Sequence, residues 1–136
     1  MAKEDPVREF LEEKGCGPHL VEAGLPGLVG SWEHLVQSVD AGYRLGLDDY
    51  LNDLDVRQLI EEALDVASSQ QRDEVQDRIS RADEAMRSLV VPVDGCLWGA
   101  EIAEEEEWTA KRNWWYFSRP VNANPELQAE IDGGLQ

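Results

Sequence analysis

The segment 108–120, WTAKRNWWYFSRP, carries the residue types best suited to binding a partner. Residues 109–125 include three cations and no acidic residue, in a chain that is otherwise strongly acidic. Tryptophan, tyrosine and arginine are favoured at the hot spots of protein interfaces, and aromatic rings beside arginine also stack on nucleotide bases. We therefore take six residues as candidates for a protein interface or an anion site: Lys111, Arg112, Trp114, Trp115, Tyr116 and Arg119.

We expect this aromatic segment to be extended or irregular, because aromatic residues favour strands over helices. In an extended chain Trp114 and Tyr116 share one face, while Trp115 and Phe117 share the other. One face would lie on the helices and the other would be free to bind. In the alternative interpretation all four rings cover the core and the cations pair with nearby glutamates, since aromatic clusters usually serve packing.

Metal binding is suggested only by Cys16 and His19, whose two-residue gap is that of a zinc half-site. His34 and Cys96 could complete a set of four ligands, but Cys96 has no second ligand close to it in the sequence. The alternative is a small buried cysteine and a histidine on a surface loop. We therefore expect no metal and no cofactor.

No catalytic motif is present in the sequence. It has neither a G-x-S-x-G nucleophile elbow nor a G-x-x-x-x-G-K-[ST] phosphate loop. Ser31 precedes His34 by one helical turn, but a serine at a helix start uses its oxygen to cap backbone N–H groups. Carboxylate pairs cannot be picked out, because spacing in sequence does not give separation across a pocket. We name no catalytic residue and favour a protein without enzymatic activity.

The charge balance narrows the classes of partner. The chain has 136 residues, of which 29 are acidic and 12 basic, so its net charge is −17. A nucleic-acid binder needs clustered lysine and arginine, and an anionic membrane repels so acidic a chain. A basic protein is a suitable partner, and the carboxylates could also mimic the charge of a nucleic acid. The plainer alternative is that the charge serves solubility alone.

Length and composition predict one acidic helical domain over residues 1–136, since 42% hydrophobic and 30% charged residues are typical of a globular chain. Two widely separated cysteines, Cys16 and Cys96, do not make a disulfide framework. No signal peptide is visible, and the longest apolar run, 89–93, is far too short to cross a membrane. We infer a reducing, cytoplasmic setting.

Helix signals are clear in the first third of the chain. Asp5 is placed to cap a helix that has Pro6 at its first position, which predicts a helix over residues 5–14. A short helix is then expected to end at Gly24. Turn-like chain follows until Ser31 caps the next helix.

The clearest amphipathic pattern spans residues 47–67, where apolar residues recur with the 3.6-residue period of a helix. We favour two helices with a kink near Asp53–Asp55, in which Asp55 caps the second; one bent helix is the alternative. Ser68 and Gln71 have the spacing of a capping box, which starts a long helix to residue 89. We expect this helix to lie antiparallel against the one before it.

The last third of the chain predicts a short acidic helix over 101–107, the aromatic segment, and a final helix capped by Asn124 with Pro125 at its first position. The fold class is therefore all-α: a small single-domain helical bundle with a short non-helical aromatic segment near the C-terminus.

The function that these observations favour is a non-enzymatic protein–protein interaction module, whose partner is another protein and in particular a basic one. Two alternatives stay open. One is a small-ligand-binding protein or enzyme with an anion site near the Trp/Arg segment 108–120, and the other is a nucleic-acid charge mimic. Direct binding to nucleic acid or membrane is not expected, and a homodimer would use the aromatic segment for self-association.

Overall fold

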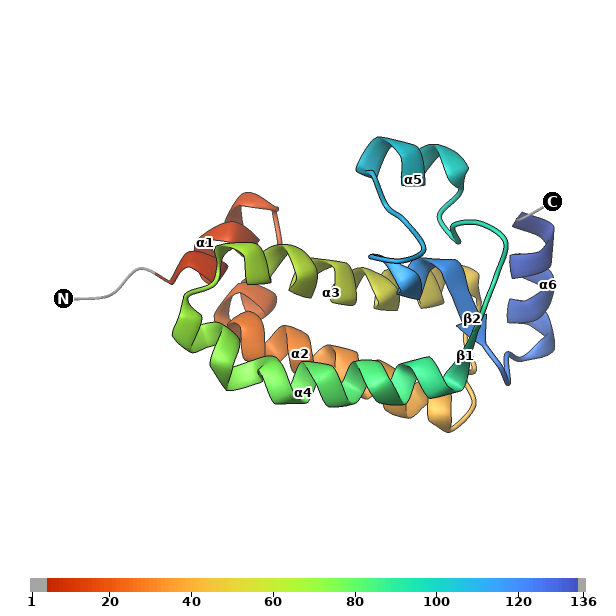
Figure 1. Ribbon diagram of the computed structural model, residues 1–136, viewed down its shortest axis with the longest axis horizontal. Helices are drawn as coiled ribbons and strands as arrows, with labels where there is room; N and C mark the ends of the chain where they lie inside the picture. Colours follow the sequence, from red (N-terminus) through yellow and green to blue (C-terminus); the bar gives the residue numbers. More distant parts are fainter. Residues whose placement is uncertain (1–4, 135–136) are drawn as a thin grey trace.

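Three long helices form the body of the molecule, and shorter elements close its ends (Figure 1). The computed structural model describes residues 5–134. Within this range the predicted all-α fold is confirmed, since the chain forms six α-helices and one sheet of two short strands. The elements are α1 (Pro6–Glu13), α2 (Pro18–Asp40), α3 (Leu47–Val66), α4 (Ser69–Leu89), β1 (Val90–Pro92), α5 (Ala100–Glu106), the 3₁₀ helix η1 (Trp114–Phe117), β2 (Ser118–Pro120) and α6 (Pro125–Gly134).

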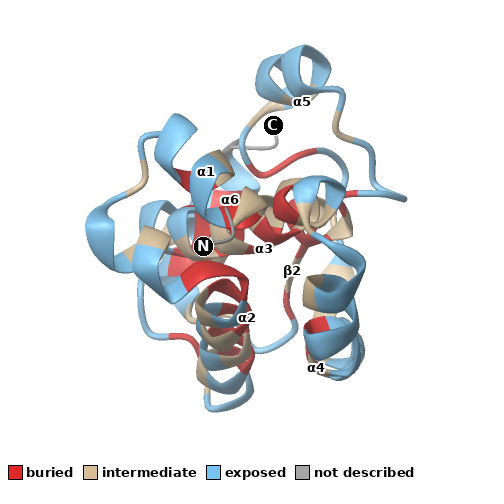
Figure 2. Ribbon diagram, turned by 90° about the vertical axis from the view of Figure 1, so that its left-hand side faces the viewer, coloured by how far each residue is buried: buried red, intermediate tan, exposed pale blue. Residues whose placement is uncertain are grey.

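The helix α2 is the centre of the packing, since it lies against α1, α3 and α4. The helices α3 and α4 run antiparallel to each other. The helix α1 lies at the end of the bundle where the turn between α3 and α4 is found (Figure 1). Figure 2 shows buried residues on the sides of the long helices that face one another, whereas α5 lies outside and has no buried residue. Among the helices at 5–134, none is both long enough and apolar enough to cross a membrane.

The predicted helix starts are confirmed at α1, α4 and α6, where a polar side chain caps each first turn. Asp5 accepts hydrogen bonds from two backbone N–H groups of α1, at 3.0 and 3.2 Å. Ser68 and Gln71 form the predicted capping box of α4. Asn124 accepts from the backbone N–H of Leu127 at 2.8 Å. These caps satisfy N–H groups that have no partner inside the helix.

The predicted turn at residues 25–30 is wrong, because α2 continues through it as one kinked element. The chain does break at Gly24, whose φ of 63° lies in the left-handed region that glycine adopts readily. Pro26 then lies in the first turn of the second segment, where its missing N–H removes no hydrogen bond. The helix therefore resumes at once, and Ser31 lies inside it instead of capping it.

The favoured kink near Asp53–Asp55 is also wrong, since α3 is one continuous helix. Asp55 caps no helix; its carboxylate instead accepts hydrogen bonds from the side chains of Tyr116 and Trp98. Apolar residues on both sides of the expected kink are buried as one stripe: Tyr50, Leu51, Leu54, Ile60 and Ala63. A stripe of this kind favours one helix, because every turn of it contributes to the same core.

The helix α4 runs antiparallel to α3 as predicted, but it packs mainly against α2. Direct contact between α3 and α4 was expected, but aromatic rings of η1 lie between them and contact cations of both helices. The guanidinium carbon of Arg57 on α3 lies 4.5 Å from the ring centre of Trp115, and that of Arg87 on α4 lies 4.3 Å from the ring centre of Trp114. The aromatic segment therefore fills the gap between the two helices.

The aromatic segment is a 3₁₀ turn followed by a strand, so the expected alternation of its side chains is wrong. The neighbours Trp115 and Tyr116 are both buried, because three residues per turn do not place adjacent side chains on opposite faces. The strand β2 pairs antiparallel with β1, with Val91 opposite Arg119. This short ladder, which the sequence did not predict, fastens the segment to the end of α4.

One largely buried ion pair joins α3 to α4. The Arg57 side chain is only 7% exposed and makes a two-pronged contact with Asp83, at 2.9 Å from Nε and 2.8 Å from Nη2. The indole N–H of Trp32 on α2 donates to the same carboxylate, at 2.9 Å. Burial alone would lower the pKa of Arg57, but the hydrogen bonds and charges of Asp83 and Glu61 together outweigh it and raise the pKa. The guanidinium is therefore charged.

Replacement of this carboxylate should therefore be strongly destabilising. The substitution Asp83→Ala leaves the indole N–H of Trp32 without its acceptor and leaves the buried guanidinium with Glu61 as its remaining carboxylate, so it should lower the free energy of unfolding by about 3 kcal/mol. The exposed residue Asp77 on the same helix is the control, since Asp77→Ala should change the free energy of unfolding by at most about 0.5 kcal/mol. Urea unfolding of both variants checks this, and equal losses would contradict the role of Asp83.

Candidate functional site

The six candidate residues of the aromatic segment do not form one exposed surface. Trp115 and Tyr116 are 1% and 0% exposed, so these two rings cover the core as the alternative interpretation proposed. Trp114 and Arg119 are partly buried, and the Arg119 guanidinium donates to the carbonyl oxygen of Pro120. Only Lys111 and Arg112 are exposed.

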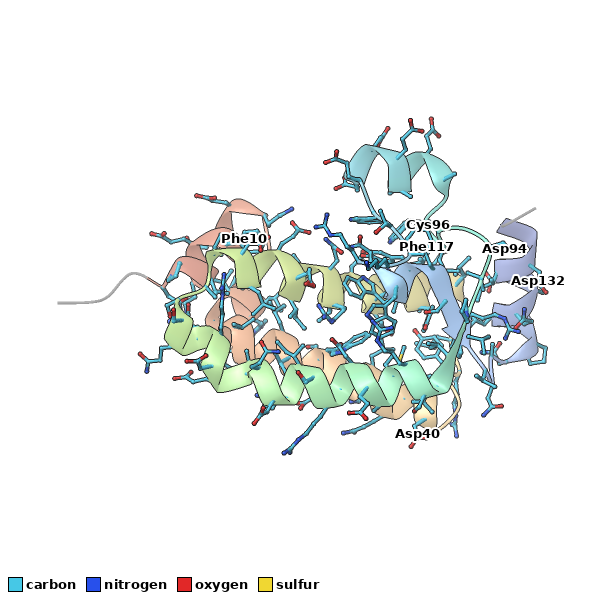
Figure 3. The ribbon with its side chains drawn as sticks, viewed as in Figure 1. Phe10, Asp40, Asp94, Cys96, Phe117 and Asp132 are labelled. Atoms are coloured by element: carbon cyan, nitrogen blue, oxygen red, sulfur yellow. The ribbon has the colours of Figure 1, made fainter. Side chains whose placement is uncertain are left out.

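A cleft of about 490 Å³ lies between α3 and α5, and the aromatic segment forms part of its wall. Figure 3 shows side chains gathered beneath α5, near Cys96 and Phe117, while the oxygen atoms on α5 point outward. The lining residues are Lys14, Cys16, Asp55, Gln58, Leu59, Glu62, Trp98, Ile102, Glu106, Trp108 and Tyr116. We call this hollow the α3–α5 cleft.

The aromatic wall of the α3–α5 cleft is held by the carboxylate of Asp55. One of its oxygens accepts from the phenol of Tyr116 at 2.5 Å and from the indole N–H of Trp98 at 3.0 Å. Trp108 stacks on Tyr116 with ring centres 4.2 Å apart. Burial and the neighbouring Asp55 raise the pKa of Tyr116, so its hydroxyl stays a donor. The rings therefore have defined positions before any ligand arrives.

The lining of the α3–α5 cleft also contains an ion pair. The ammonium of Lys14 lies 2.7 Å from the carboxylate of Glu62, and the two side chains are 46% and 33% exposed. The hydrogen bond to Glu62 raises the pKa of Lys14, and the charges of Glu62 and Glu106 add to this effect. An ammonium group is therefore stabilised at this point of the cleft.

A smaller hollow of about 200 Å³ continues the α3–α5 cleft towards the loop after α5. Gln58, Glu62, Glu106 and Trp108 line both spaces. Five carboxylates surround the smaller one: Glu61, Glu62, Asp65, Glu106 and Glu107. The one cation among its lining residues is Arg112. Carboxylates in this excess repel an anion, so Arg112 is poorly placed to serve an anion site.

A larger hollow, of about 870 Å³, lies elsewhere, between α2 and the chain that leads into α3. Small residues of α2 form much of its wall, including Gly27, Gly30 and Ser31. Its Tyr43 hydroxyl already donates to Asp53 at 2.7 Å. The hollow is larger than the α3–α5 cleft, but it lacks the combination of ordered aromatic rings and excess charge that can select a ligand.

The sequence candidates for a metal do not come together in a ligand set. Within residues 5–134 no three His, Cys, Asp or Glu side chains are grouped so that they could hold a metal ion. Cys16 lines the α3–α5 cleft as a free thiol, while His19 is exposed on the first turns of α2. Cys96 is buried, and burial raises the pKa of its thiol.

Sequence reasoning placed Trp108 in the aromatic segment but missed other residues that define the α3–α5 cleft: Lys14, Asp55, Glu62, Trp98 and Ile102. A signal for two of them was present, because Trp98 and Ile102 are large apolar residues in an acidic stretch. They are 36% and 38% exposed. The pairing of Lys14 with Glu62, 48 positions apart, has no local signal.

The chain was compared with known proteins at three levels. No protein-family model matches it, and no curated protein and no solved structure matches it. The inference of function therefore comes from the chemistry of the α3–α5 cleft.

Loss of the ion pair between Lys14 and Glu62 should produce a measurable change in the pKa of Lys14. Because the folded-state pKa of Lys14 is raised, the pair stabilises the fold below the ordinary lysine pKa and loses this effect as pH rises through the raised value. The substitution Glu62→Gln should lower the pKa of Lys14, as measured by NMR titration of its side-chain signals. The control Glu84→Gln, at an exposed site on α4, should leave that pKa unchanged. A similar fall in both variants would mean that overall charge sets the pKa.

Proposed function

We propose that this protein is a binding module for another protein, and that it takes up a basic segment of its partner in the α3–α5 cleft. The observation that carries the proposal is the composition of the walls. Ordered aromatic rings and exposed apolar side chains lie beside carboxylates that exceed the available cations. A segment with lysine or arginine next to apolar residues complements both parts of this surface.

The charge of the cleft supports this choice of partner. The residues that line the cleft and its smaller continuation include six carboxylates, Asp55, Glu61, Glu62, Asp65, Glu106 and Glu107. The cations among these lining residues are Lys14 and Arg112. The whole chain adds a long-range field of the same sign, since its net charge is −17. Such a field raises the rate at which a basic partner arrives.

The apolar part of the cleft makes the interaction more than a charge attraction. Trp98 is 36% exposed and Ile102 is 38% exposed, although both lie beside the acidic wall. Burial of apolar area contributes about 25 cal/mol per Å², so coverage of these side chains by a partner adds affinity that salt does not screen. The proposal therefore requires a segment that is both basic and apolar.

Binding of a peptide with alternating lysine and leucine tests the proposal. Wild-type protein should bind it more tightly than a peptide in which leucine is replaced by serine, and added salt should weaken both complexes. The double substitution Glu62→Gln with Glu106→Gln should weaken binding of the lysine–leucine peptide by about fivefold. Isothermal titration calorimetry at two salt concentrations measures these affinities.

The matched control for this experiment changes overall charge by the same amount elsewhere. Asp77→Asn with Glu84→Gln removes two carboxylates from the exposed face of α4, and should reduce affinity much less than the cleft variant. Equal losses in the two double variants, or no difference between the leucine and serine peptides, would contradict binding in the cleft.

A further inference from the structure

The α3–α5 cleft already contains a basic side chain of the protein itself. Lys14 is the C-cap residue of α1, and its ammonium reaches across to Glu62 on α3 at 2.7 Å. The same ammonium lies 5.7 Å from the ring centre of Phe10, within the range of a cation–π contact. The cleft therefore already accommodates one ammonium group.

The hydrogen bonds of Glu62 restrict the shape of that cation. One carboxylate oxygen, Oε2, accepts from the side-chain amide of Gln58 at 3.1 Å, which leaves Oε1 to contact Lys14. Gln58 in turn accepts from the amide of Asn113 at 2.9 Å, and Asn113 is only 3% exposed. These hydrogen bonds between side-chain amides and Glu62 fix the orientation of its carboxylate.

The carboxylate of Glu62 suits an ammonium better than a guanidinium, because a guanidinium bound to both oxygens would have to share Oε2 with the amide of Gln58. An arginine gains most from two parallel hydrogen bonds to both oxygens of a carboxylate, whereas lysine acts as a compact point charge. Asp55 is no better suited to a two-pronged contact with arginine, because its Oδ1 already accepts hydrogen bonds from Tyr116 and Trp98. The hydrogen-bond pattern therefore favours lysine over arginine at both carboxylates.

The apolar wall suits the rest of a lysine side chain. Leu59, Trp98 and Ile102 line the cleft together with Glu62 and Glu106. A lysine carries four methylene groups, which pack on such a surface while the charged end reaches a carboxylate. Acetylation would remove the charge and add a group that Glu62 cannot bind as an ion.

We propose that the group recognised in the α3–α5 cleft is a lysine side chain of the partner, and that it takes the place of Lys14 at Glu62. The inference rests on the proposed function and adds both the identity of the recognised residue and a competition within the cleft. Lys14 can leave, because it is half exposed and partly exposed ion pairs contribute little to stability. Its own contact with Glu62 lowers the apparent affinity for the partner.

The first experiment compares small probes on the wild-type protein. Nα-acetyl-lysine amide, the arginine equivalent and the Nε-acetylated lysine equivalent are titrated while the indole N–H signals are followed by NMR. Trp98→Phe assigns the signal of the indole that donates to Asp55. That signal should move most with the lysine probe, less with arginine and least with acetyl-lysine. Equal shifts with lysine and arginine would overturn the choice of lysine.

The second experiment tests the competition by removing the internal cation. The substitution Lys14→Met keeps a long apolar side chain and should tighten binding of the lysine–leucine peptide by about threefold. The control Arg81→Met removes the same charge from an exposed site on α4 and reports the effect of overall charge alone. The proposal requires a larger gain in Lys14→Met than in Arg81→Met.

The results separate this inference from the proposed function. One outcome is that Glu62→Gln with Glu106→Gln weakens peptide binding, while Lys14→Met gains no more affinity than Arg81→Met. The proposed competition by Lys14 is then wrong, and the proposed binding function is retained. If the wild-type protein fails to bind and Lys14→Met binds, the competition is supported. If neither protein binds the peptide, both proposals are overturned. A loss of affinity in Lys14→Met would assign Lys14 to binding itself and would also overturn the competition.

Discussion

The carboxylate of Asp83 is the contact on which the arrangement of the long helices depends. It receives the guanidinium of Arg57 from α3 and the indole N–H of Trp32 from α2, while it belongs to α4. Three helices therefore share one buried polar centre. The rings of η1 lie beside it, since Arg57 covers the ring of Trp115. A charge that satisfies several donors sets which faces of the helices meet, whereas apolar packing alone tolerates alternatives.

The aromatic segment connects this centre to the α3–α5 cleft. Trp115 faces the ion pair, and the next residue, Tyr116, donates to Asp55 in the wall of the cleft. One 3₁₀ turn thus supplies a ring to the core and a ring to the surface site. Backbone hydrogen bonds from Val93 and Leu97 to the same turn also position the chain that leads into α5. Core and cleft are built from consecutive residues.

Local signals in the sequence predicted most of the helices but few of the contacts between them. Caps such as Asp5 and Ser68 act within four residues, so their effect is visible in the sequence. Asp55 looked like a cap by the same criterion, yet its partners lie 43 and 61 positions away. The aromatic segment was singled out for its composition, but the 3₁₀ turn that buries it depends on the bundle. The cleft residues come from distant parts of the chain, so their meeting follows from tertiary structure alone.

The helix α5 has no buried residue, and its last turn ends at Glu107 in a left-handed conformation with φ of 59°. Its opening would expose almost none of the core, so the free energy of that local event should be far smaller than that of global unfolding. We therefore expect α5 to open locally while the rest of the bundle stays folded. Amide hydrogens of α5 should exchange with solvent through local opening, whereas those of α2 and α3 should exchange only when the whole bundle unfolds.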